Sequence, residues 1–113
     1  MKPEQLQEKL NELNVLQQRL GIFTQQRQHL EMSKSEIETS ADEVSNAKGK
    51  VYSLTGNVII EKDAKKLKSE LISQKKDIVK HLTTVSTQEE KLKDRALKLQ
   101  TDVTKGLKDD KSN

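Results

Sequence analysis

The sequence has no cysteine, one proline, four glycines, one tyrosine and one phenylalanine among its 113 residues. Without cysteine, disulfide bonds and thiol chemistry are excluded. No apolar run approaches the roughly 18 residues of a membrane-spanning helix, and the opening MKPEQLQEKL is too polar for a signal peptide. Hydrophobic residues make up only 31%, against roughly half in an average domain. We therefore expect a soluble, cytoplasmic protein without a large globular core, either disordered or built from long amphipathic helices.

Charged residues make up 35% of the chain, with 21 basic and 18 acidic residues. The net charge is therefore only +3, and the two signs alternate along both halves of the sequence. This pattern is typical of solvated helix surfaces with paired charges, and it argues against a basic patch for nucleic acid.

The first part of the chain carries the seven-residue repeat of a coiled coil. With Leu6 at position a, nine of its twelve a and d positions are apolar: Leu6, Lys9, Leu13, Leu16, Leu20, Phe23, Arg27, Leu30, Lys34, Ile37, Ala41 and Val44. Pro3 suits a first helical turn, and Gly49 suits the end of a helix. We therefore predict one long amphipathic helix within residues 1–48.

The second part repeats the same pattern after Asp63, a good N-cap residue. Eight of its twelve a and d positions are apolar: Lys68, Leu71, Lys75, Ile78, Leu82, Val85, Glu89, Leu92, Ala96, Leu99, Val103 and Gly106. Ile72 and Val79 are expected to widen this seam. We predict a second helix over 63–107 and a disordered tail over 108–113.

The two seams match when the helices fold back about Gly56. Leu13 then faces Leu99, Leu16 faces Ala96, Leu20 faces Leu92 and Leu30 faces Leu82. A disordered chain has no reason to show this symmetry. The expected fold class is mainly α, a long antiparallel two-helix coiled coil. Charged seam residues such as Arg27 are expected to cover apolar surface with their stems while the charge reaches water.

The centre of the chain, KVYSLTGNVIIEKD at residues 50–63, predicts one β-hairpin over 49–62. Pairing Leu54 with Val58 and Tyr52 with Ile60 around a three-residue turn, 55–57, places all four side chains on one face. A lone hairpin is marginally stable, and an exposed apolar one aggregates unless another chain covers it.

A narrow coiled coil cannot cover this apolar face. We therefore infer that hairpins of several chains combine into a shared sheet or a closed β-barrel. The residues expected to make this subunit assembly are Val51, Tyr52, Leu54, Gly56, Val58, Ile59 and Ile60. The alternative is a hairpin folded down onto its own helices.

Architecture and motif together resemble the β-type subunits of prefoldin, a hexameric co-chaperone. The order is long helix, one hairpin, long helix, and the motif is VYSLTGNVIIEKD at residues 51–63. The matching positions are Val51, Tyr52, Gly56, Val58, Ile59, Ile60, Lys62 and Asp63. The resemblance implies α-type and other β-type subunits as partners, joined through a barrel platform. It further implies an ATP-independent chaperone that holds unfolded proteins, such as actin and tubulin chains, at its coiled-coil tips and delivers them to a cytosolic chaperonin.

On this interpretation the client-binding tips lie at the ends of the helices farthest from the hairpin. Their apolar residues are Leu6, Leu10, Leu13, Leu99, Val103 and Leu107. Lys9 and Gly106 interrupt the seam there, so we expect the tip to open readily. The alternative is that these leucines simply close the seam. Off-seam Val15 and Ile22 form an outer apolar stripe that would extend a client-facing surface.

The sequence has few residues that could form a metal, phosphate-binding or catalytic site. His29 and His81 fall outside the seam, and two ligands do not make a structural zinc site. The sequence has no phosphate-binding glycine loop, and a narrow coiled coil offers no enclosed cleft. We expect no enzyme activity, no cofactor and no metal.

Two rival functions remain open at this stage. One is a structural coiled-coil scaffold or tether without chaperone activity. The other is a nucleic-acid binder that uses the lysines nearest the hairpin, which are Lys62, Lys65, Lys66, Lys68, Lys75 and Lys76. Because Tyr52 and Phe23 are the only aromatic residues, no stacking platform is available for bases. We therefore expect neither nucleic acid nor membrane as a partner.

Overall fold

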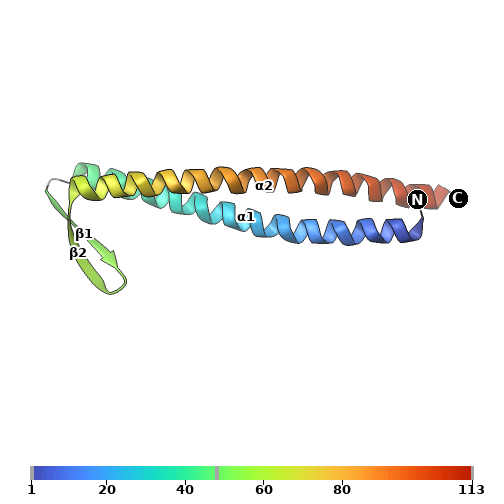
Figure 1. Ribbon diagram of the computed structural model, residues 1–113, viewed down its shortest axis with the longest axis horizontal. Helices are drawn as coiled ribbons and strands as arrows, with labels where there is room; N and C mark the ends of the chain where they lie inside the picture. Colours follow the sequence, from blue (N-terminus) through green and yellow to red (C-terminus); the bar gives the residue numbers. More distant parts are fainter. Residues whose placement is uncertain (1, 48, 113) are drawn as a thin grey trace. The chain divides into compact units, whose positions relative to one another are not determined.

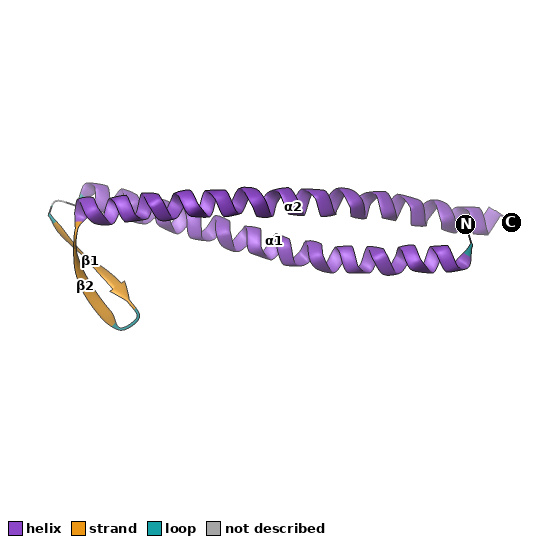
Figure 2. Cartoon of the chain, viewed as in Figure 1, coloured by secondary structure: helices purple, strands orange, loops and turns teal. Residues whose placement is uncertain are grey.

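The computed structural model describes residues 2–47 and 49–112, with the side chains of all but 53, 55 and 109–112. Its elements are α1 (Pro3–Asn46), β1 (Lys50–Thr55), β2 (Val58–Asp63) and α2 (Ala64–Ser112) (Figures 1 and 2). The chain divides into two compact units. The first unit joins Met1–Arg27 to Thr84–Asn113, and the second unit is Gln28–Thr83. The expected order of two long helices around one hairpin is confirmed.

The first unit is a pair of antiparallel helix segments with a narrow apolar core. Leu13 and Leu16 of α1 form the buried cluster with Leu92 and Ala96 of α2. The partly buried residues packed against this cluster are Leu20, Phe23 and Leu99. Three of the predicted seam layers therefore lie in one core.

Burial follows the heptad pattern along both helices. All predicted a and d positions of α1 are buried or half-buried, and those of α2 are too, except Lys68. The expectation that Ile72 and Val79 widen the seam is wrong, because they are 53% and 39% exposed. Both follow a d position by one residue, which turns them out of the seam.

The second unit holds the end of α1, the hairpin and the start of α2. Helix α1 closes with the Ala47 N–H donating to the Val44 carbonyl (3.1 Å). Gly49 has a φ of 94°, a backbone conformation that favours glycine. Its carbonyl accepts a hydrogen bond from the Ala64 N–H (3.0 Å), which ties the start of the hairpin to the first residue of α2.

The hairpin has a different register from the predicted one. Thr55 lies opposite Val58, and Leu54 lies opposite Ile59, so the predicted pairing of Leu54 with Val58 is wrong by one residue. The turn contains only Gly56 and Asn57. Gly56 has a φ of 62°, and no described non-glycine residue has a positive φ, as in a type II′ turn with glycine first.

Helix α2 continues to Ser112, so the predicted disordered tail over 108–113 is wrong for 108–112. Residue 113 lies outside the described part. Once a helix exists, each added residue gains a hydrogen bond without a new nucleation step. Lys108 also suits the negative end of the helix dipole.

Candidate functional site

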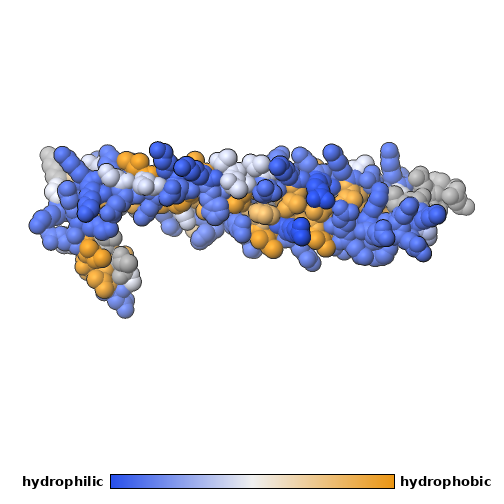
Figure 3. All heavy atoms as spheres, in the orientation of Figure 1, coloured by the Kyte–Doolittle hydropathy of each residue, from blue (hydrophilic) through white to orange (hydrophobic). Residues whose placement is uncertain are grey.

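The hairpin exposes most of its apolar side chains. Tyr52, Leu54 and Ile59 are 70%, 71% and 69% exposed, and Val58 and Ile60 are 59% and 41% exposed. Figure 3 shows this apolar surface on the hairpin. Among the predicted assembly residues, only Val51 is half-buried. The alternative of a hairpin folded down onto its own helices is therefore wrong.

The observed register gives the hairpin two apolar faces. Because paired residues share a face and neighbours alternate, Leu54, Ile59 and Tyr52 lie on one face. Val58, Ile60 and Val51 lie on the other face. The prediction of a single apolar face is wrong, and complete coverage of this hairpin requires partners on both sides.

Polar contacts fix the base of the hairpin within the second unit. Lys50 Nζ lies 3.2 Å from Glu61 Oε1 across the two strands. Lys62 Nζ donates to Glu70 Oε2 at 3.0 Å and so links β2 to the first turns of α2. Tyr52 lines a shallow hollow with residues of both helices: Ser40, Glu43, Val44, Leu67 and Leu71.

The predicted tip residues are gathered in the first unit, but most of them are covered. Leu13 and Val103 are buried between the helices, and Leu6, Leu10 and Leu99 are half-buried. Only Leu107 is exposed, at 45%. The described state is thus a closed seam, in which most of these side chains become accessible only if the helix ends separate.

Ion pairs flank this part of the seam. Lys9 Nζ donates to Asp102 Oδ2 at 3.3 Å, so the lysine that interrupts the seam has a partner on α2. Arg95 and Glu12 form a second bridge at 3.3 Å, with both side chains more than half exposed. Exposed pairs of this kind contribute about 0–1 kcal/mol, so they do little to keep the tip closed.

A polar layer interrupts the seam farther along the helices. Arg27 Nε donates to both carboxylate oxygens of Glu89, at 2.9 and 2.8 Å. The expectation that the Arg27 charge reaches water is wrong, since the Arg27 and Glu89 side chains are only 27% and 20% exposed. The sequence interpretation missed this pair because it compared only directly facing positions.

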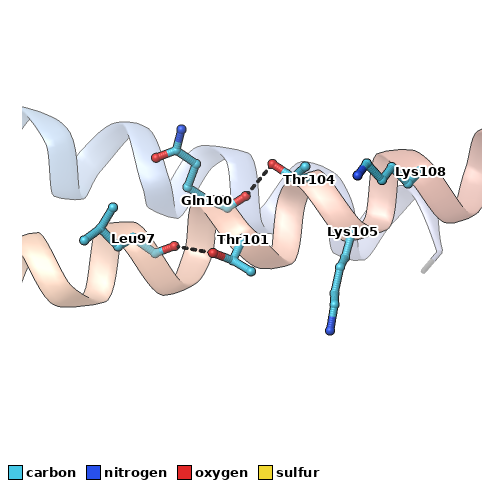
Figure 4. Close-up of a pocket in the computed structure, with 6 residues that line it drawn as sticks. All are labelled: Leu97, Gln100, Thr101, Thr104, Lys105 and Lys108. Carbon is cyan, nitrogen blue, oxygen red and sulfur yellow. Dashed lines mark hydrogen bonds between the residues drawn. The ribbon is translucent and has the colours of Figure 1, made fainter.

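The outer side of α2 in the first unit has a shallow, open hollow. It is lined by Leu97, Gln100, Thr101, Thr104, Lys105 and Lys108 (Figure 4). Thr101 Oγ1 donates to the Leu97 carbonyl and Thr104 Oγ1 to the Gln100 carbonyl, at 3.0 and 2.8 Å. Both hydroxyls are thus bonded within their own helix, and no carboxylate or imidazole lines the hollow.

The residues considered for metal or nucleic-acid binding do not form a site. His29 and His81 are both exposed, and no group of metal-binding side chains exists among the described residues. Within the lysine cluster, Lys62 and Lys75 are engaged by Glu70 and Glu38. None of the described helices combines the length and apolar character needed to cross a bilayer.

Comparisons with known proteins agree with this architecture. Residues 7–110 match the sequence profile of a family described as Prefoldin subunit. The crystal structure of the prefoldin beta subunit from Thermococcus strain KS-1 matches with a TM-score of 0.84 at 26% sequence identity, covering 93% of this chain and 94% of that chain. No curated protein sequence matches the chain. Both similarities extend over the two helices and the hairpin together.

Proposed function

The chain belongs to the prefoldin subunit family and is of the β type, and on this premise we propose that it is one subunit of a hetero-hexameric, ATP-independent co-chaperone. Its partners are α-type and other β-type prefoldin subunits in the cytoplasm. The assembly holds unfolded proteins, such as actin and tubulin chains, at its coiled-coil tips and passes them to a cytosolic chaperonin. The family is of a non-enzymatic chaperone type.

The exposed apolar hairpin is the observation that carries this proposal. Burying apolar surface contributes roughly 25 cal/mol per Å², and a hairpin with two open edges also offers unpaired backbone groups to another strand. Tyr52, Leu54 and Ile59 are each about 70% exposed, so their burial is available only to intermolecular contact. A passive tether gives no reason for such a surface.

The ends of the helices supply the client-binding part of the proposal. Leu10 and Leu107 lie outside the a and d positions, and Gly106 leaves one seam position without a side chain. Separating the helices there exposes leucines at the cost of only a few contacts. Each buried leucine contributes about 1.5–3 kcal/mol at best, so one tip binds weakly. Several tips on one platform then bind one unfolded chain through effective concentration.

The assignment of the client-binding tip is tested by the aggregation of unfolded actin after its dilution out of urea. The wild-type assembly, formed with an α-type prefoldin subunit, should slow the rise of light scattering. We expect the Leu10→Gln/Leu107→Gln variant to assemble normally and to need roughly fivefold more protein for the same protection, because the two lost contacts together contribute about 1 kcal/mol after ordering costs.

Leu97→Gln is the matched control, since Leu97 is 54% exposed in the same unit but lies outside the proposed tip. It should protect actin like the wild type. A wild-type assembly that leaves actin aggregation unchanged would identify the protein as a scaffold and overturn the chaperone proposal.

A further inference from the structure

Charge in the second unit is divided between its two helices. The segment of α1 over 28–46 has five acidic residues and one basic residue: Glu31, Glu36, Glu38, Asp42, Glu43 and Lys34. The segment of α2 over 64–83 has six basic and two acidic residues: Lys65, Lys66, Lys68, Lys75, Lys76, Lys80, Glu70 and Asp77. One end of the chain's helix pair therefore offers opposite charges on two different helices.

One side of α2 combines these lysines with exposed apolar residues. The basic face consists of Lys65, Lys68, Ile72, Lys76 and Val79, all exposed. Steps of three and four residues place them on one side of the helix. Ile72 and Val79 line a shallow groove with Lys75 and Lys76, and the chain itself leaves this groove uncovered.

One side of α1 has the complementary composition. The acidic face consists of Met32, Glu36, Thr39 and Glu43, again all exposed and spaced by three or four residues. Met32 is 63% exposed. Glu43 also borders the hollow beside Tyr52, so this face continues into the surface of the hairpin.

The charges on these two faces are not used inside the chain. One ion pair between the two helix segments joins Lys75 Nζ to Glu38 Oε1, at 3.2 Å. Lys65, Lys68, Lys76, Glu36 and Glu43 form no ion pair with another described residue. Their positions on the outer sides of the helices leave them available to another chain.

The two faces match in order when counted from the hairpin ends of the helices, Asn46 and Ala64. Glu43 and Lys68 lie 3 and 4 residues in, Thr39 and Ile72 lie 7 and 8, Glu36 and Lys76 lie 10 and 12, and Met32 and Val79 lie 14 and 15. A mismatch of one or two residues is about 1.5–3 Å of helix rise, which a lysine side chain spans. Opposite charges and apolar residues thus meet in the same sequence.

We propose that the basic face of α2 docks against the acidic face of α1 in a second copy of this chain. The hairpins of the two copies then lie at the same height along the paired helices. Lys68 then pairs with Glu43, Lys76 with Glu36, and Val79 contacts Met32. The contact is heterologous, since each copy offers both faces, and it suits a ring-like assembly. It rests on the proposed function: exposed ion pairs are individually weak, so the faces act only after the hairpins have joined the chains. Their effect is to set the order and orientation of neighbours.

Cysteine cross-linking tests this contact cleanly, because the natural chain has no cysteine. A Met32→Cys chain and a size-tagged Val79→Cys chain are mixed, assembled with an α-type prefoldin subunit and oxidised. We expect a disulfide-linked dimer of one chain of each kind, in excess over dimers of identical chains. The Met32→Cys/Leu97→Cys mixture is the control and should give only background dimer.

Charge-reversal variants in the same cross-linking experiment test the proposed ion pairs. Adding Glu36→Lys and Glu43→Lys to the Met32→Cys chain should lower the mixed dimer about fivefold or more, as expected for losing roughly 1 kcal/mol. Adding Lys68→Glu and Lys76→Glu to its partner should restore the yield.

Native mass of the same samples separates the two proposals. An intact assembly without mixed dimer above the control overturns the docking inference alone, and loss of the assembly in the unmodified chain overturns the proposed function. If Lys68→Glu/Lys76→Glu abolishes binding of a single-stranded RNA oligonucleotide and leaves cross-linking unchanged, the face serves nucleic acid and the inference is wrong.

Discussion

At the scale of single residues, the polar layer formed by Arg27 and Glu89 is the main departure from an apolar seam. Two hydrogen bonds from one guanidinium nitrogen, at 2.9 and 2.8 Å, hold the carboxylate between the helices. Partly buried ion pairs seldom add net stability, because desolvation offsets the attraction between the charges. Removing one partner leaves the other charge half-buried and unpaired.

We expect Glu89→Leu to lower the free energy of unfolding by about 1–3 kcal/mol and Arg27→Leu/Glu89→Leu to be at least as stable as the wild type. Urea unfolding, followed by the α-helical circular dichroism signal, measures the free energy of unfolding of both variants. Glu12→Ala breaks the exposed bridge to Arg95 and serves as control, with an expected change below about 0.5 kcal/mol. A double variant less stable than Glu89→Leu alone would contradict this interpretation.

At the scale of elements, the hairpin depends on its two-residue turn. Gly56 has a φ of 62°, where a side chain costs about 1–3 kcal/mol. We expect Gly56→Ala to speed amide hydrogen exchange of β1 and β2 roughly 5- to 150-fold, because local opening of the hairpin becomes easier by that free energy.

The same substitution in α1 is the matched control. Gly21 lies in the helix, and a Cβ added there meets no atom within 4 Å. Gly21→Ala should stabilise the helix by about 0.5–1 kcal/mol and leave strand exchange unchanged. Equal exchange rates in Gly56→Ala and the wild type would mean that the turn is not what holds the register.

The helices could be predicted from the sequence because the heptad pattern repeats over many residues. Successive layers of the seam therefore support the same register. The register of the hairpin could not be predicted. Val58, Ile59 and Ile60 are consecutive apolar residues. Shifting the pairing of the two strands by one residue therefore places other apolar side chains on each face and loses no apolar burial. The two-residue turn adds the Thr55–Val58 pair, in which both residues are β-branched and favour strands.

The seam at the proposed tip could be predicted from the sequence, but whether that seam is closed or open could not. Heptad spacing places Leu13 and Val103 in the seam, and the structure buries both. Whether helix ends separate depends on the balance between a few apolar contacts and the entropy of fraying, which periodicity does not encode. The basic and acidic faces were missed because charges at outer positions are normally taken as solvated surface.

At the scale of the whole molecule, the proposed assembly follows from a difference between the hairpin, whose apolar side chains are exposed, and the helices, whose apolar seam is covered. The helices use their apolar seam on each other, while Leu54 and Ile59 of the hairpin remain 71% and 69% exposed. Two apolar faces and two open edges on one hairpin are best satisfied by strands from other subunits, as in a closed barrel. The proposed chaperone activity depends on this step, because on this proposal a single tip binds too weakly to hold a client.

Native mass spectrometry of the chain mixed with an α-type prefoldin subunit tests most directly whether the hairpin is the assembly surface. The wild type should form a mixed hexamer, while Leu54→Lys/Ile59→Lys and Val58→Lys/Ile60→Lys, which charge opposite faces of the hairpin, should remain unassembled. Val15→Lys/Ile22→Lys places the same charges on exposed positions of α1 and should assemble like the wild type. Hexamers of unchanged abundance in both hairpin variants would contradict the assignment of the hairpin as the assembly surface.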